Sequence, residues 1–126
     1  MFEELLTGMV QKIPGTLGAT LIGYDGIPVA CMTPKGPRTG LELGDELWEA
    51  ASIDLLRSLE GMREISRKLN SSAPEQVSIQ TEDFTLLMRP LSEQYVLVLA
   101  LNKDTWAGKG RYIMRVVGAE ISQELP

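Results

Sequence analysis

The run from Tyr95 to Leu101, which reads YVLVLAL, constrains the fold more than any other part of the sequence. A strand with one face in water alternates apolar and polar residues, whereas this run is almost continuously apolar. It predicts a central strand that is covered on both faces, so helices must lie on both sides of its sheet. The run is also far too short to cross a bilayer, which needs about 20 residues in a helix.

Three segments have apolar residues three or four positions apart, which indicates helices. We expect the first over residues 2–12, because Pro14-Gly15 ends it. We expect the second over about 45–69, with Asp45 as its N-cap. The third covers about 105–124, and its apolar stripe consists of Trp106, Gly110, Ile113, Val117 and Ile121.

Five shorter apolar segments are bounded by turn residues, which indicates strands. They cover residues 17–24, 27–32, 77–81, 84–89 and 95–101. Asp25-Gly26 joins the first two and predicts a hairpin with a type I′ turn, in which both central residues need a positive φ. Pro28 has no amide hydrogen to donate, so the second strand is expected at a sheet edge. Residues 33–44 are rich in glycine and proline and are expected to form a loop.

The expected order is therefore helix, two strands, helix, three strands and helix. A chain of 126 residues suits one domain, and we expect residues 1–126 to form it. An α/β sandwich accounts for the order: a five-stranded, mainly antiparallel sheet with helices on both faces.

The second helix has more apolar residues than one face needs. Its main stripe predicts the core contact and consists of Leu47, Trp48, Ala51, Leu55, Leu59, Met62, Ile65 and Leu69. Ala50, Ile53 and Leu56 lie off this stripe. A helix that is apolar on two sides is buried on two sides, so in a domain of this size the second side is expected to meet another chain.

The composition removes most catalytic chemistries. The sequence has no histidine, which is the commonest general base, the commonest metal ligand and the partner of serine or cysteine nucleophiles. We find no phosphate-binding loop and no metal-ligand spacing, so we expect no active site and no cofactor. A formal charge of −5 disfavours nucleic acid and anionic membranes as partners. The single cysteine, Cys31, and an acidic N-terminal stretch favour the cytoplasm.

The order of elements resembles that of the Roadblock/dynein light-chain family over essentially the whole chain. Residues 18–30, GATLIGYDGIPVA, resemble the family's first hairpin: a glycine, an apolar strand, Asp-Gly, and a short strand that ends in a small residue. The long second helix, the three-strand meander and a last helix that opens near Gly108-Lys109-Gly110-Arg111 also fit. None of these motifs is a catalytic signature.

The resemblance implies a homodimer in which the second helices pack together and the third strands pair to extend one sheet across two chains. On this sequence the helix contact would use Ala50, Ile53, Leu56 and Arg57, and the strand contact would use Val77, Ile79 and Thr81. Bacterial and archaeal relatives, gliding-motility regulators among them, act on small Ras-like GTPases. The resemblance therefore implies a non-catalytic regulator or adaptor that binds such a GTPase and modulates its nucleotide cycle or location.

Three other functions stay open on the sequence. One is a purely structural adaptor, which the sequence does not separate from a GTPase regulator. A second is a small-ligand sensor, for which Tyr24, Cys31 and Tyr95 are the weak candidates for polar groups in an apolar cavity. The third is a hydrolase that uses carboxylates alone, although no acidic pair has a visible reason to be buried.

Overall fold

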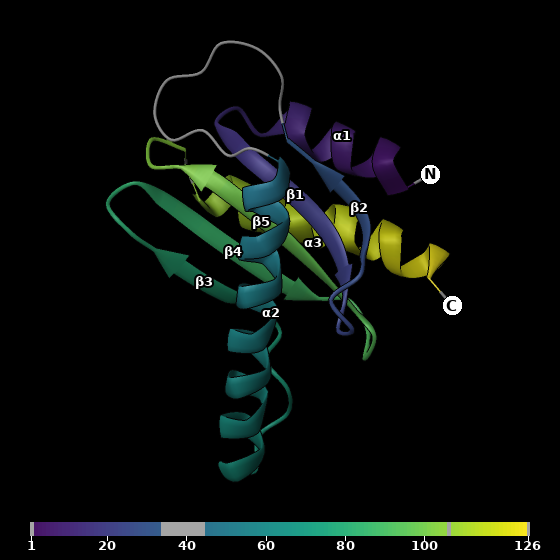
Figure 1. Ribbon diagram of the computed structural model, residues 1–126, viewed down its shortest axis with the longest axis vertical. Coiled ribbons are helices and arrows are strands. Elements are labelled where there is room, and N and C mark those ends of the chain that lie inside the picture. Colours follow the sequence, from purple (N-terminus) through teal and green to yellow (C-terminus); the bar gives the residue numbers. More distant parts are fainter. Residues whose placement is uncertain (1, 34–44, 106, 126) are drawn as a thin grey trace.

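The computed structural model describes residues 2–33, 45–105 and 107–125, and it contains the expected elements in the expected order (Figure 1). They are α1 (Phe2–Lys12), β1 (Thr16–Gly23), β2 (Pro28–Met32), α2 (Asp45–Lys68), β3 (Val77–Gln80), β4 (Phe84–Pro90), β5 (Tyr95–Asn102) and α3 (Ala107–Glu124). Residues 34–44 of the loop expected at 33–44, the Asp45 side chain as N-cap and Trp106 in the last stripe lie outside the described residues.

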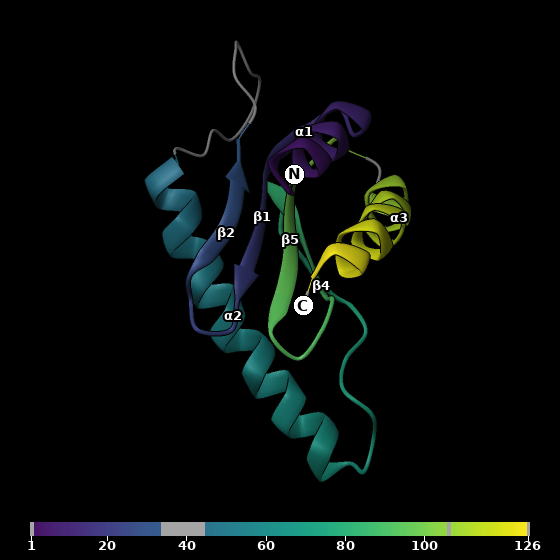
Figure 2. The same ribbon diagram turned by 90° about the vertical axis from the view of Figure 1, so that its right-hand side faces the viewer.

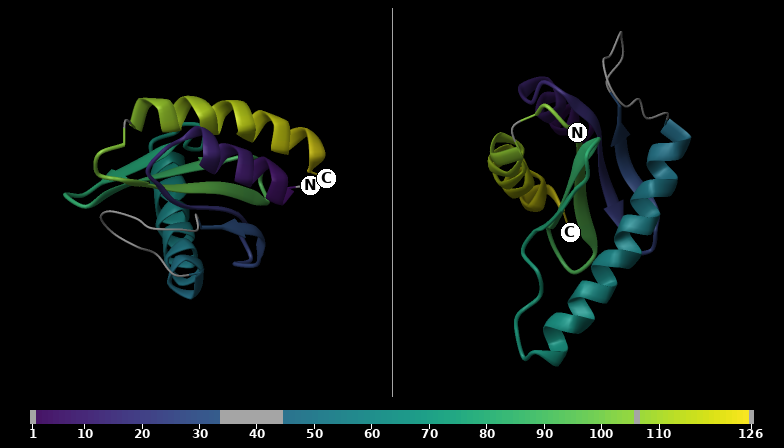
Figure 3. Two further views of the ribbon diagram at one scale, coloured as in Figure 1. Left: turned by 90° about the horizontal axis from the view of Figure 1, so that it is seen from above. Right: turned by 90° about the vertical axis from the view of Figure 1, so that its left-hand side faces the viewer.

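The five strands form one sheet in the order β2-β1-β5-β4-β3, and all neighbours are antiparallel. β5 is the central strand, as its continuous apolar run predicts, and its residues 96–101 are all buried. α1 and α3 lie on one face and α2 lies on the other, which makes three layers (Figures 2 and 3). The α/β sandwich with helices on both faces is therefore confirmed.

Two apolar cores lie on the two faces of the sheet. On one face α1 and α3 pack on the strands, and the larger buried side chains are Leu6, Met9, Ile13, Leu21, Leu87, Leu97, Leu99, Leu101, Met114 and Ile121. On the other face the core consists mainly of Trp48, Leu55, Leu56 and Leu59 of α2 with Ile22, Met88, Val96 and Val98 of the strands. Successive side chains of β5 thus enter opposite cores, as the two-residue period of a strand requires.

The β1–β2 hairpin lies where Asp25-Gly26 places it, but its turn type was predicted wrongly. Gly26 has a φ of 86°, whereas Asp25 is not among the described residues with positive φ, so the turn is not type I′. The Gly26 amide donates to the Gly23 carbonyl at 2.9 Å, and the Gly23 amide donates to the Ile27 carbonyl at 3.1 Å. These bonds close a three-residue loop with a left-handed glycine at its end.

Candidate functional site

α2 covers only part of its face of the sheet. The helix lies closest to β1 and β2, and β3 lies well to its side in Figure 1. On this face Met88 of the β3–β4 hairpin is buried, but four of the hairpin's apolar side chains are only half-buried; they are Val77, Ile79, Phe84 and Leu86, here called the open strip. The open strip is apolar surface beside α2 that no described helix covers.

One flank of α2 is apolar and exposed. The exposed fractions of Leu47, Ile65 and Leu69 are 60%, 58% and 73%, and Met62 is half-buried. From Ala51 onward the spacing alternates between four and three residues, which is typical of a seam between two packed helices: Ala51, Leu55, Ser58, Met62, Ile65 and Leu69. We call Leu47, Ala51, Met62, Ile65 and Leu69 the apolar flank.

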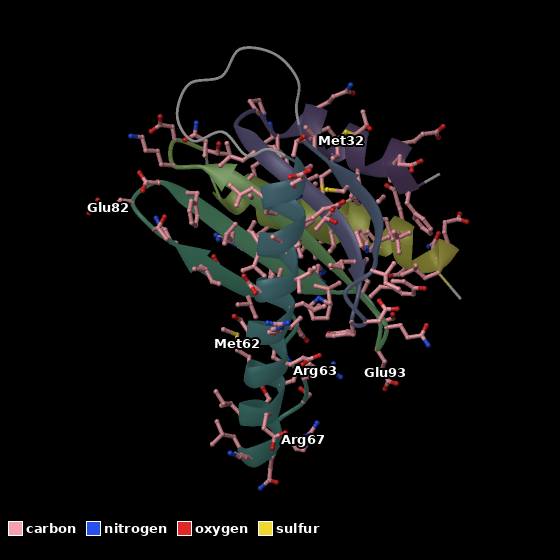
Figure 4. All side chains as sticks on the ribbon, in the orientation of Figure 1. Met32, Met62, Arg63, Arg67, Glu82 and Glu93 are labelled. Carbon is pink, nitrogen blue, oxygen red and sulfur yellow. The ribbon has the colours of Figure 1, made fainter. Side chains whose placement is uncertain are left out.

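The apolar flank faces the open strip. Figure 4 shows Met62 on the side of α2 toward β3 and Arg63 on the opposite side. The Arg63 guanidinium lies 4.7 Å from the centroid of the ring of Tyr24, which is in the turn of the β1–β2 hairpin. This contact independently places Arg63 on the side of α2 toward that hairpin. Met62 of the apolar flank therefore lies on the same side of α2 as the open strip.

The C-terminal half of α2 continues past the sheet. Its buried side chains lie between Trp48 and Leu59, and none from Glu60 to Lys68 is buried. Figures 1 and 2 show this half extending beyond the ends of the strands. Most helical stability in proteins comes from tertiary packing. An overhang that carries Met62, Ile65 and Leu69 on one side is therefore typical of a helix that packs against another chain.

The two edges of the sheet differ in how they are protected. β2 carries Pro28, and its pairing with β1 is irregular between Leu21 and Ile22. Proline and a bulge are devices that blunt an edge against further pairing. β3 reads VSIQ, with neither a proline nor a charge, and it pairs only with β4 among the described strands. The β3 edge is therefore the one suited to pairing with another chain.

The predicted interface residues of α2 differ in how far they are buried. Ala50 and Arg57 are exposed, and Ile53 is half-buried against the α2 core. Leu56 is only 4% exposed and belongs to that core, so the prediction that it lies off the core was wrong. Leu47, Ile65 and Leu69 were expected in the core and are exposed instead.

The strand residues lie where an edge contact would need them. Val77 and Ile79 of β3 belong to the open strip, and Thr81 is exposed directly after the strand. The Thr81 amide donates to the Phe84 carbonyl at 2.9 Å, which closes the turn into β4.

The candidates for a ligand sensor do not share a cavity. Tyr24 and Cys31 pack on the α2 side of the sheet, whereas Tyr95 packs on the α1–α3 side. Tyr24 and Tyr95 line an open surface groove with Asp25, Glu93 and Gln94. Burial raises the pKa of the Tyr24 phenol, and the Arg63 guanidinium opposes that shift. The predicted sensing site inside the protein is therefore not formed by these three residues.

The described residues contain no group of three or more histidine, cysteine, aspartate or glutamate side chains that could hold a metal ion. In the same part of the chain, no helix has the length and apolar character needed to cross a membrane.

Solved structures resemble this chain over nearly its whole length, although no family model and no curated protein matches it. MglC from Myxococcus xanthus is 31% identical, with a TM-score of 0.72 and 98% of each chain covered. The Roadblock/LC7 domain from Streptomyces avermitilis is 15% identical, with a TM-score of 0.83, 97% of this chain and 95% of that chain. The gliding protein MglB from Thermus thermophilus is 19% identical, with a TM-score of 0.77, 97% of this chain and 88% of that chain.

These neighbours agree with the features described above. The similarity to MglC and to the Streptomyces domain extends over almost the full length of both chains, so it includes all the elements of the fold. Identity of 31% over 98% of each chain adds a sequence relationship to the shared fold. The protein belongs to the Roadblock/LC7 family.

Proposed function

We propose that the protein is a non-catalytic homodimeric adaptor that binds a small Ras-like GTPase and modulates its nucleotide cycle or location. The observation that carries the proposal is the apolar flank of α2 beside the open strip. Both are apolar, both are incompletely covered in the single chain, and Met62 of the flank lies on the side of α2 toward β3. A large exposed apolar surface of this kind marks a protein interface.

A second copy of the chain is the occupant that fits this surface. Its own α2 would lie beside the first and cover the open strip, while the two β3 edges pair. Burying a side chain such as Leu47, Ile65 or Leu69 contributes about 1.5–3 kcal/mol. In a two-fold dimer each such contact occurs twice, because the same surface is used by both chains.

The proposed seam differs from the one expected from the sequence. Ala50, Ile53 and Arg57 lie on the other flank of α2 from Met62 and Ile65, so only one of the two flanks can border the open strip. We keep Val77, Ile79 and Thr81 in the proposed interface and replace the helix residues by the apolar flank. The helix residues expected from the sequence become the alternative outcome of the test.

Sedimentation equilibrium of Ile65→Asp and Ile53→Asp decides between the two flanks. We expect Ile65→Asp to be monomeric and Ile53→Asp to stay dimeric, because an unpaired charge in a buried seam costs several kcal/mol. Ile27→Asp is the matched control, since Ile27 is 65% exposed on the β1–β2 hairpin. The reverse result would return the seam to the Ala50–Ile53–Arg57 flank. If both variants stayed dimeric, neither flank of α2 would be the seam.

The GTPase partner is supported by family membership and by the sequence resemblance to gliding-motility regulators. MglB is itself a gliding protein. The test is a pull-down from native lysate with the tagged chain, once with GDP and once with a non-hydrolysable GTP analogue. Enrichment of a small GTPase in one nucleotide state is expected, and a hydrolysis assay then separates activation from positioning. Recovery of the same assembly in both states would favour a structural adaptor instead.

A further inference from the structure

A basic groove lies on the opposite face of the sheet from α2, between α3 and the β3–β4 hairpin. It has a volume of about 340 Å³ and is lined by Gln76, Arg89, Gly108, Arg111, Tyr112 and Arg115. Three of these lining residues are arginines, in a chain whose formal charge is −5. Such a concentration of positive charge in an acidic protein requires an explanation of its own.

The three arginines come from two elements that are distant in sequence. Arg111 and Arg115 are four residues apart and therefore lie on the same face of α3. Arg89 reaches them from β4. Its guanidinium donates to the Gln76 amide oxygen at 3.2 Å. Its Cδ lies 3.7 Å from the place where a Cβ on Gly118 would be, so the Arg89 stem runs along α3.

The positive charges of the groove are not neutralised within the described chain. The two salt bridges of the described residues are Arg57–Asp54 and Arg67–Glu64, both on α2. Gln76 is neutral, and the Arg115 guanidinium lies 5.6 Å from the centroid of the Tyr112 ring, which is a cation–π contact. The guanidinium forks of the groove therefore keep donors for an external anion.

We propose that this groove binds the carboxylates of an acidic segment of a partner protein. Arginine forks match carboxylates in paired, charge-assisted hydrogen bonds. A short acidic segment can interact with the groove alone, whereas a nucleic acid or an anionic membrane extends over more of a chain whose formal charge is −5 and is disfavoured by that charge. The proposal does not depend on the α2 seam or on a GTPase, since it concerns the opposite face of the sheet.

Fluorescence anisotropy with a labelled six-residue glutamate peptide tests the proposal on the full chain. Arg111→Gln with Arg115→Gln removes two cations from the groove. Arg67→Gln with Lys68→Gln removes two exposed cations from the end of α2 and is the matched control. We expect the groove variant to weaken peptide binding by about tenfold or more, and the control to change it by less than about twofold.

Thermal unfolding of both variants shows that each is folded before binding is compared. Equal loss of binding in the two variants would overturn the proposal, because the attraction would then depend on overall charge. Absence of peptide binding by the parent chain would overturn it as well. The proposal would also be overturned if the parent chain bound inorganic phosphate saturably, the groove variant did not, and neither bound the glutamate peptide.

Discussion

The indole ring of Trp48 in α2 lies directly on Gly18 in β1. A Cβ on residue 18 would be 2.9 Å from Cε2 of the ring, which is closer than Cβ atoms approach other groups. Trp48 is completely buried, and among the described residues its Nε1 has no hydrogen-bond acceptor. Glycine normally weakens a strand, but here it provides the space that lets α2 approach the sheet.

Gly18→Ala is therefore expected to destabilise the protein. The added methyl group must displace Trp48 or β1, and overpacking of this kind costs about 1–3 kcal/mol. Urea unfolding followed by tryptophan fluorescence measures the change. Gly8→Ala in α1 is the control, because a Cβ there meets nothing within 4 Å. It should raise the free energy of unfolding by about 0.5–1 kcal/mol. Similar behaviour of the two variants would contradict the tight contact.

Leu56→Ala should lower the free energy of unfolding by about 2–5 kcal/mol, because it leaves a cavity in the α2 core. Leu56→Asp should unfold the single chain rather than only separate two chains, since Leu56 is 4% exposed. Chemical denaturation measures both variants. Ile27→Ala, at a position that is 65% exposed, should stay within about 0.5 kcal/mol of the parent. A stable Leu56→Asp monomer would mean that Leu56 is not a core residue.

Tyr24→Phe should change how stability depends on alkaline pH. Burial raises the pKa of the Tyr24 phenol above its ordinary value of 10.0, although the Arg63 guanidinium acts in the opposite direction. The folded chain then holds the proton more tightly than the unfolded chain, so stability falls as the pH rises above about 10. We expect the parent to lose stability more steeply than Tyr24→Phe as the pH rises from about 9 to about 11. Parallel curves from denaturant titrations would refute this dependence.

Ile79→Asp should weaken the proposed dimer by about tenfold or more, because Ile79 belongs to the open strip on the edge strand β3. Val29→Asp is the control on the opposite edge strand, where Val29 is 39% exposed. Sedimentation at several concentrations gives both dissociation constants. Thermal unfolding at low concentration checks that each monomer is folded. A weaker dimer in Val29→Asp than in Ile79→Asp would place the contact at the β2 edge.

The sequence predicts the layers of this fold well because the sheet buries β5 on both faces. The spacing of apolar residues in the sequence also predicts the bounds of the helices and strands to within two residues. It predicts the faces of α2 less well. The core residues and the apolar flank overlap on the helical wheel, so the pattern combines Leu47 and Leu69 with Trp48 in one stripe. Only the position and length of the sheet decide that Leu56 is covered and that Ile65 and Leu69 are not.

The basic groove was not predictable for a different reason. Arg89 and Arg111 are on separate elements, and only the packing of α3 on β4 places them at the same groove. The turn at Asp25-Gly26 shows the same limit on a smaller scale. Its residues identify a hairpin, but the loop length depends on the register of β1 with β2.

The unequal edges of the sheet also limit how far this protein can assemble. A sheet that is open at both sides can add chains without end, as fibrils do. Here Pro28 and the irregular pairing of β2 close one side, and only β3 is free of such features. If chains join by pairing their β3 edges, the sheet would therefore stop growing at two copies. The β2 edge, which faces outward on both chains, would prevent a third chain from pairing.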